Sequence, residues 1–194
     1  MSSYSAKELR VSEENAISDL DHPGWYRWWA PVELCRRLLG PHAVKVLPHL
    51  KIGTDDLQDY RLVYVGIAAK ESLYDRVVTW HIRQTHTHTN ISRGFLSTFR
   101  QTISSLEAGS QAAEAKTNAV IDQLRVELFP VQMRIRDDVT KKHLEAAEDA
   151  QLNSCMIPFN IKGNQNETLH DFLGYLRGMR KMGKAQGLKE IKRG

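Results

Sequence analysis

The sequence predicts an α+β fold: a small three-stranded β-sheet, antiparallel or mixed, flanked by α-helices and followed by an amphipathic, basic C-terminal helix. Three short stretches alternate apolar and polar residues with the two-residue period of a strand. Between and after them, apolar residues recur every three or four positions, as on one face of a helix. With 194 residues, the chain is expected to form one domain, with its core at about 20–165 and a helix and basic tail at 166–194.

The first two predicted strands are rich in aromatic residues. WYRWWA places Tyr26 and Trp28 on one face, and DYRLVYVGI places Leu62 and Tyr64 on one face. The other face of the second strand carries Val63, Val65 and Ile67. The two tyrosines can therefore face the same side of neighbouring antiparallel strands, where opposite Cβ atoms are about 5 Å apart.

The third predicted strand is PVQMRIR at 130–136, in which apolar and polar residues alternate. Its apolar residues are Val131, Met133 and Ile135. With the first two stretches it completes the predicted three-stranded sheet.

Four stretches with helical signals lie between and after the strands. PVELCRRLLG is a short helix that Gly40 ends. SLYD has a serine followed three residues later by an acid, similar to a capping box, and begins a helix with Leu73, Val77 and Trp80 on one stripe. LSTFRQTISSLEAG and TKKHLEAAEDAQLNSC are the other two.

The last predicted helix begins near Thr168 and is amphipathic. Its apolar stripe consists of Leu169, Phe172, Leu173, Leu176 and Met179. The basic residues that lie largely off this stripe are Arg177, Lys181 and Lys184. Residues 177–194 hold seven basic residues against Glu190 alone. This charge favours a polyanionic partner, with a merely solvated helix face as the alternative.

Composition excludes several classes of protein. Hydrophobic content of 41% and charged content of 26% argue against a wholly disordered chain. The absence of an apolar run of about 20 residues predicts no membrane span, and the polar opening stretch does not read as a signal peptide. Cys35 and Cys155 form no paired metal-binding spacing, and both are expected to be reduced. We therefore expect a cytoplasmic protein.

Four short motifs stand in a fixed order along these elements. In chain order they are GWY (24–26), YVG (64–66), SLYDR (72–76) and PFN (158–160), the last preceded by Glu148. From about residue 23 to 166 this order resembles the GIY-YIG nucleases, in which two tripeptides on neighbouring strands precede a helix with an Arg, a later Glu and then an Asn. The chain is identified as a candidate member of that family.

The resemblance implies hydrolysis of phosphodiester bonds in double-stranded DNA with a divalent cation, Mg²⁺ or Mn²⁺. Glu148 would be the metal ligand, and Arg76 would hold a phosphate oxygen as negative charge develops. Tyr26 is assigned as general base and Tyr64 as the residue that orients phosphate or water, although the reverse assignment stays open. Asn160 would fix the geometry of the site.

One position departs from the family pattern. The family commonly has a His four residues after the Arg, but here that position holds Trp80, and His81 follows. In a regular helix His81 would lie about 140° round from Arg76. Either the helix bulges there and His81 is catalytic, or His81 is a packing residue.

Specificity within the family class would have to come from loops, the basic helix or a homodimer on DNA, and a restriction-like role is favoured. The possible DNA contacts are Arg27, Arg83, Arg93 and Arg100. His86 and His88 lie in a stretch read as a solvated loop or one near DNA, because no third metal ligand stands beside them. Glu145 lies one turn before Glu148 and is judged a decoy.

A second function class competes with the enzyme. The displaced histidine and the basic tail would fit a non-catalytic nucleic-acid-binding or interaction protein that keeps the nuclease fold. The combined presence of Tyr26, Tyr64, Arg76 and Glu148 favours the enzyme.

Overall fold

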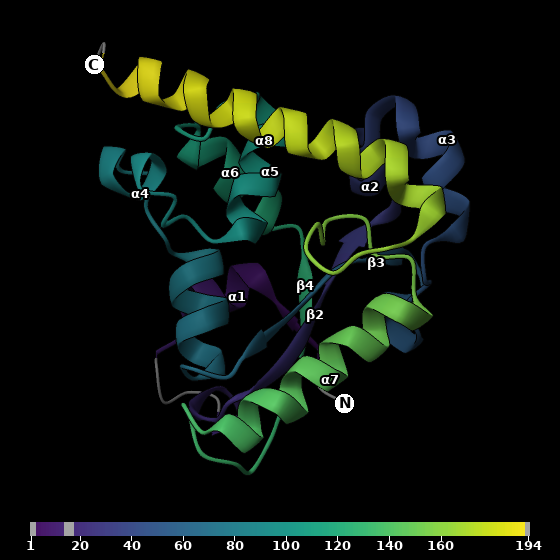
Figure 1. Ribbon diagram of the computed structural model, residues 1–194, viewed down its shortest axis with the longest axis vertical. Coiled ribbons are helices and arrows are strands. Elements are labelled where there is room, and N and C mark those ends of the chain that lie inside the picture. Colours follow the sequence, from purple (N-terminus) through teal and green to yellow (C-terminus); the bar gives the residue numbers. More distant parts are fainter. Residues whose placement is uncertain (1–2, 14–17, 193–194) are drawn as a thin grey trace.

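The computed structural model describes residues 3–13 and 18–192. It confirms the α+β class, because helices surround an antiparallel sheet whose strands lie in the order β1-β4-β2-β3 (Figure 1). The strands are β1 (Ser3–Ser5), β2 (Gly24–Pro31), β3 (Tyr60–Ala68) and β4 (Arg125–Pro130). The sheet has one strand more than expected, because β1 adds a short edge beside β4. The last two residues of the basic tail lie outside the described residues.

The α-helices are α1 (Ala6–Val11), α2 (Val32–Leu39), α3 (Ala43–Val46), α4 (His88–Ser92), α5 (Thr98–Ala108), α6 (Glu114–Ile121), α7 (Asp138–Ser154) and α8 (His170–Ile191). A π-helix, η6, spans Tyr74–Ile82. Short 3₁₀ turns are η2 (Ser18–Asp21), η3 (Gly40–His42), η4 (Leu47–His49), η5 (Asp55–Leu57) and η7 (Glu167–Leu169). The predicted helices are all present, and Gly40 ends α2 with a positive φ of 53°.

The prediction of a strand at 130–136 is wrong. The third long strand is β4, which ends at Pro130, and the following residues connect it to α7. In β4, Val126 and Leu128 are buried on one face, while Glu127 is buried on the other and accepts a hydrogen bond from Trp29 Nε1 at 2.7 Å. Sequence analysis did not identify β4 because a charged residue, Glu127, occupies a buried position in it. The alternating residues after Pro130 do not pair with the sheet.

The predicted pairing of Leu62 with Tyr64 on one face is also wrong. Trp28 lies opposite Tyr64, but Trp29 lies opposite Leu62, so Val63 is the extra residue of a β-bulge. Leu62 therefore packs in a smaller core beneath α7, whereas Tyr64 belongs to the main core. The bulge turns Leu62 away from the face that carries both Tyr26 and Tyr64.

The sheet separates these two cores. The main core fills the space between one face of the sheet and α2, η6, α5 and α8. The smaller core lies under α7 and consists of Trp29, Leu57, Leu62, Val65, Leu152 and Ile157. Figure 1 shows α7 and α8 as long helices on separate edges of the molecule. The irregular segment between them is hydrogen-bonded to the middle of β3, at Val63 and Val65. The functional side chains gather where these parts meet.

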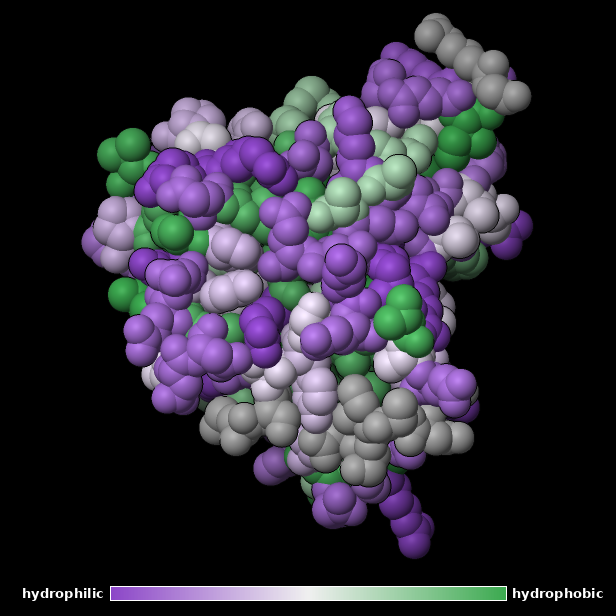
Figure 2. Space-filling view, turned by 180° about the vertical axis from the view of Figure 1, so that it is seen from behind, coloured by the Kyte–Doolittle hydropathy of each residue, from purple (hydrophilic) through white to green (hydrophobic). Residues whose placement is uncertain are grey.

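The C-terminal amphipathic helix is present as α8, which packs along α5. Gly183 and Gly187 allow the close approach, since an added Cβ would lie 2.6 Å from Ser105 Oγ and 2.8 Å from Ala112 N respectively. Seen from behind, the surface is mostly hydrophilic, with smaller hydrophobic patches (Figure 2). Among the described residues, no helix has the length and apolar character needed to cross a bilayer.

Candidate active site

The two tyrosines are diagonal neighbours on β2 and β3. Tyr26 lies opposite Gly66 and Tyr64 lies opposite Trp28, which puts both rings on one face with their centroids 6.5 Å apart. The ring of Tyr26 lies directly over Gly66, where an added Cβ would be 2.4 Å from the phenolic oxygen. The glycine of YVG is thus required by the tyrosine of GWY, which explains why the two tripeptides occur together.

The glycine of GWY has a similar role. A Cβ at Gly24 would come within 2.5 Å of the carbonyl oxygen of Phe129 and 2.8 Å of the side chain of Leu73. Gly24 therefore lets β4 and the start of the helical segment approach the strand that carries Tyr26.

His81 is brought beside Tyr26 by the π-helix η6. A π-helix turns by i→i+5 hydrogen bonds, and here the N–H of Arg83 donates to the carbonyl of Val78 at 2.8 Å. Residues five apart then share a face, so His81 returns to the side of Arg76. The expected stripe is wrong at Trp80, which is 41% exposed. The helix is irregular, as the first reading of the displaced histidine requires, and a catalytic role for His81 stays a prediction.

His81 is hydrogen-bonded through both ring nitrogens. Its Nε2 lies 2.6 Å from the phenolic oxygen of Tyr26, and its Nδ1 lies 2.9 Å from Ser97 Oγ. Ser97 caps α5 and accepts the backbone N–H of Arg100 at 3.2 Å. The imidazole, which is 1% exposed, is therefore held in one orientation against the phenol.

Arg100 supports this arrangement through hydrogen bonds to the end of η6. The prediction that Arg100 contacts DNA is wrong. It is fully buried, and its guanidinium donates to the carbonyl oxygens of His81 and Ile82, both at 2.9 Å, and to Asn118 Oδ1 at 2.7 Å. These two carbonyls lie at the C-terminal end of the π-helix, where no backbone N–H of the same helix is available to donate to them. Arg100 therefore holds the end of η6 in the register that places His81.

The reading of His86 as a solvated loop residue is wrong as well. Its Nδ1 donates to the carbonyl of Gln111 at 2.6 Å, which leaves Nε2 to accept from Arg100 Nε at 2.9 Å. Burial and the neighbouring Arg100 lower the pKa of His86 to about 4. His86 is thus a neutral packing residue, whereas His88 is exposed on α4.

Burial dominates the electrostatics of the phenols and the imidazole. It raises the pKa of Tyr26 well above its usual value, and the neighbouring Tyr64 adds to the effect while Arg76 opposes it. Burial also lowers the pKa of His81 well below its usual value, helped by Arg76 and Arg100. At neutral pH the pair is therefore a neutral phenol beside a neutral imidazole.

Arg76 lies at the start of η6 beside a carboxylate that sequence analysis did not identify. Its Nη2 forms an ion pair with Glu71, and its Nε is buried without a hydrogen-bond partner among the described residues. The side chain remains 35% exposed. The guanidinium is thus oriented by Glu71 and still open on one side, which suits an incoming anion.

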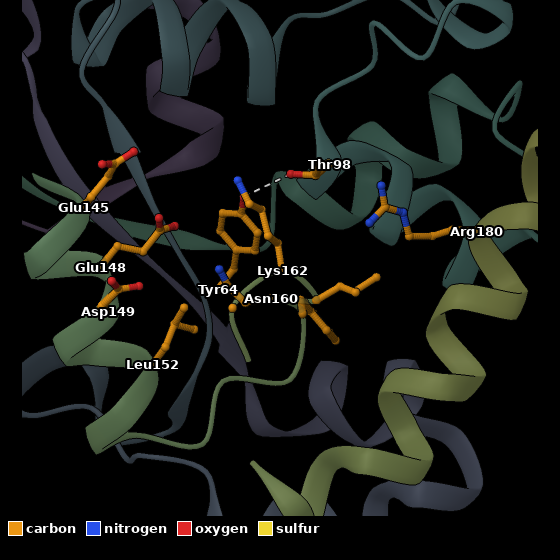
Figure 3. Close-up of a pocket in the computed structure, with 12 residues that line it drawn as sticks. Tyr64, Thr98, Glu145, Glu148, Asp149, Leu152, Asn160, Lys162 and Arg180 are labelled. Carbon is orange, nitrogen blue, oxygen red and sulfur yellow. Dashed lines mark hydrogen bonds between the residues drawn. The ribbon is translucent and has the colours of Figure 1, made fainter. Parts of the chain in front are cut away.

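Glu148 projects from α7 into a cleft of about 530 Å³. In Figure 3 it lies beside Glu145 and Asp149 on one wall, with Tyr64 in the middle and Arg180 of α8 on the opposite side. Burial raises the pKa of Glu148, and the carboxylates of Asp149 and Glu145 add to the shift while Lys162 opposes it. This wall concentrates negative charge in a partly buried place.

The donor set fits a hard divalent cation bound mainly through water. Within residues 3–13 and 18–192, no group of three or more His, Cys, Asp or Glu side chains could hold a metal ion. Glu148 is a half-buried carboxylate that lines the cleft, and its pKa is raised first by burial and then by the neighbouring Asp149 carboxylate. Mg²⁺ commonly binds through one or two carboxylates and several waters, which such a cleft can accommodate.

Asn160 anchors the strand that carries Tyr64. Its Oδ1 accepts the N–H of Val65 and its Nδ2 donates to the carbonyl of Val65, both at 2.9 Å. Because Val65 follows Tyr64 directly, this pair of bonds ties the segment after α7 to β3. These contacts fix Asn160 against β3, and its supporting role in the site stays a prediction.

Among the residues that line the cleft and that sequence analysis missed are Thr98, Lys162 and Arg180. Thr98 lies 3.2 Å from the hydroxyl of Tyr64 and counteracts part of the rise that burial causes in the pKa of that phenol. For Arg180 a signal was present, since it lies four residues after Leu176 on the apolar stripe of α8. A basic residue at such a position must be buried or point into a cavity.

The other arginines proposed as DNA contacts differ in their surroundings. Arg27 stacks on Trp25 and donates to Gln151 Oε1 at 2.6 Å. Arg83 donates to Tyr74 Oη at 2.7 Å, and Arg93 is exposed at the end of α4. Contact with DNA stays a prediction for these three.

A protein-family comparison matches this arrangement over most of the chain. The family model described as the GIY-YIG catalytic domain matches residues 24–182. The match begins at the glycine of GWY and ends two residues after Arg180 on α8. No curated protein and no solved structure matches the chain.

Proposed function

This chain belongs to the GIY-YIG nuclease family, and we propose that it is an active, divalent-metal-dependent endonuclease that hydrolyses phosphodiester bonds in double-stranded DNA. The contact between Tyr26 Oη and His81 Nε2 carries the proposal. A phenol is a poor base at neutral pH unless something accepts its proton. Here the acceptor is buried, neutral and in hydrogen-bonding contact.

The proton path follows from the two bonds of His81. With Nδ1–H donating to Ser97 Oγ, Nε2 accepts the phenolic proton of Tyr26. The phenolic oxygen takes a proton from the attacking water in the same event, so that no separate phenolate forms in this buried place. The resulting hydroxide forms a bond to phosphorus as the bond from phosphorus to the 3′ oxygen breaks. The leaving oxygen takes a proton from solvent, and the proton held on His81 Nε2 returns to solvent afterwards, which restores the neutral imidazole.

The other residues act on charge and position. Arg76 holds a phosphate oxygen and gains interaction energy as negative charge develops in the transition state. Tyr64, hydrogen-bonded to Thr98, orients the phosphate or the water. Glu148 would hold Mg²⁺ or Mn²⁺, which supplies Lewis-acid stabilisation of the phosphate and leaving oxygen when bound. Asn160 keeps Tyr64 in place through Val65.

The non-catalytic alternative rested partly on the displaced histidine. The π-helix removes that reason, because His81 lies on Tyr26 despite its spacing in the sequence. A restriction-like role and a homodimer on DNA remain parts of the proposal. A cytoplasmic location is also proposed, and the free thiols of Cys35 and Cys155 fit a reducing compartment.

The test is incubation of the purified protein with mixed plasmid and phage DNA, and separately with RNA, in Mg²⁺, Mn²⁺ or EDTA. We expect cleavage of DNA that EDTA abolishes, and Tyr26→Phe should serve as the inactive control. Discrete bands on a gel would support a sequence-specific enzyme, and a smear would indicate a nonspecific one. Binding of DNA without cleavage in either metal would favour the non-catalytic alternative.

A further inference from the structure

Arg180 is a cation on the cleft wall opposite the acidic residues of α7. It projects from α8 toward the cleft in Figure 3, and it lines the same cavity as Glu148, Tyr64 and Lys162. The described residues offer it no carboxylate within ion-pair distance; its one side-chain hydrogen bond runs from Nη2 to Gln101 Oε1 at 2.7 Å. A half-buried guanidinium without a counter-ion is costly, and an anion would relieve that cost.

The surroundings hold Arg180 in one place. Gln101 is itself fixed, because its Nε2 donates to the carbonyl of Leu96 at 2.6 Å. The backbone carbonyl of Arg180 accepts from Gln111 Nε2 at 3.2 Å, and the N–H of Gln111 donates to the carbonyl of Gly183 at 2.8 Å. With α8 seated closely on α5 through its buried glycines, the guanidinium is oriented before any ligand arrives.

Electrostatics separates the two walls of the cleft. Glu145, Glu148 and Asp149 make the α7 wall negative, whereas Lys162 and Arg180 are the cations of the cleft. Arg180 opposes the rise that burial causes in the pKa of Tyr64, and burial lowers the pKa of Arg180 itself. Tyr64 lies between the two walls in Figure 3. A polyanion crossing Tyr64 would therefore pass from the metal-binding wall to a fixed cation.

We propose that Arg180, with Lys162, forms a phosphate subsite that binds a phosphodiester of the substrate strand next to the one being cleaved. This inference rests on the proposed nuclease function, which assigns the scissile phosphate to Arg76 and Glu148. The planar guanidinium supplies a bidentate, charge-assisted contact, and the flexible Lys162 adds a point charge. The subsite places the strand in the cleft and takes no part in proton transfer.

The first test compares Arg180→Gln with the wild-type protein on a short fluorescein-labelled DNA duplex, with Ca²⁺ replacing Mg²⁺ so that binding is measured without cleavage. We expect the Kd to rise about tenfold or more. The slope of log affinity against log salt should become shallower by about 0.9 for one lost phosphate contact. Arg180→Lys should keep most of the slope and recover part of the affinity.

The matched control is Arg36→Gln, which removes one positive charge from an exposed ion pair with Glu33 on α2. It should leave affinity and slope within about twofold of the wild type. Unchanged affinity and slope for Arg180→Gln would overturn the subsite. A large fall in kcat with unchanged Kd and KM would overturn it too, because Arg180 would then act on the transition state.

The second test uses inorganic pyrophosphate as a probe that needs no nuclease activity. Pyrophosphate should raise the Tm of the wild type and of Arg36→Gln, and raise it much less for Arg180→Gln. If the wild type cuts no nucleic acid but shows this difference, the proposed function fails and the phosphate subsite stands. Equal stabilisation of all three proteins would refute the subsite even in an active nuclease.

Discussion

The candidate site has a buried half and an open half, and they differ in how their residues are held. In the buried half, Tyr26 and His81 are enclosed and connected by hydrogen bonds to Ser97, while Arg100 secures the end of η6. In the open half, Glu148 and Arg180 lie on opposite sides of a cleft that Lys162 also lines. The difference indicates a division of tasks: the buried half sets the geometry of proton transfer, and the open half supplies charges for ligands.

The largest effect is expected in the open half from Glu148→Gln. The substitution keeps the shape but removes the charge that would hold the metal ion, so cleavage should fall by about 10³-fold or more while DNA binding stays within about tenfold. Single-turnover cleavage and anisotropy measure the two quantities. The control is Glu33→Gln, since Glu33 is exposed in an ion pair with Arg36 on α2 and does not line the cleft. Mg²⁺-dependent cleavage by Glu148→Gln at the wild-type rate would refute the metal assignment.

Arg76→Ala should have the next largest effect, because Arg76 lies where the two halves meet. Loss of a group that stabilises transition-state charge should cost about 3 kcal/mol of barrier, or about 10²-fold in rate. Glu71→Gln is the comparison, since it frees Arg76 from its ion pair without removing the guanidinium. Steady-state kinetics should show a much smaller loss for Glu71→Gln. Equal losses of rate in Arg76→Ala and Glu71→Gln would mean that Arg76 acts only through its ion pair with Glu71.

Tyr26→Phe tests the buried half. The ring still packs over Gly66, but the contact with His81 Nε2 is lost, so the rate should fall by at least about 10²-fold with little change in Tm. Tyr64→Phe, measured beside it, removes only the contact with Thr98 at 3.2 Å. The variant with the larger loss identifies the general base. If neither variant slows hydrolysis, the paired-phenol site is wrong.

Arg100→Lys should separate support from chemistry. Lysine lacks the planar fork that reaches both carbonyls at the end of η6, so the free energy of unfolding should drop by about 3 kcal/mol. The rate per folded molecule should fall by about tenfold, and the pH profile should move because His81 is displaced. Thermal melts and pH-dependent rates measure these effects. A destabilised protein with a wild-type rate and pH profile would restrict Arg100 to packing.

The smallest expected effect concerns His86 and acid stability. Its pKa is about 4 in the folded protein, against about 6.5 in an unfolded chain. Between these values the unfolded state binds more protons, so the contribution of His86 is present above pH 6.5 and is lost as the pH falls toward 4. Urea titrations at several pH values should show a shallower acid decline for His86→Gln than for the wild type. Parallel declines would contradict the assignment.

The sequence by itself determined the fold class, most helices and the set of residues now gathered at the site. The tripeptides predicted two neighbouring strands because strand period and glycine placement are local properties. The ring of Tyr26 over Gly66 shows why a glycine is needed opposite that tyrosine. The order of Arg76, Glu148 and Asn160 carried the family assignment, which the match over 24–182 confirms. The chemical roles of these residues remain predictions.

Only the tertiary structure decided where His81, Arg100 and Arg180 lie. The wider turn of the π-helix η6 brings His81 against Tyr26. This helix geometry depends on buried contacts with Ser97 and Arg100, at the start of α5. Arg180 reaches the cleft because α8 packs on α5 at a distance that glycines permit. These outcomes depend on contacts between segments far apart in the chain, and no local period or propensity encodes such contacts.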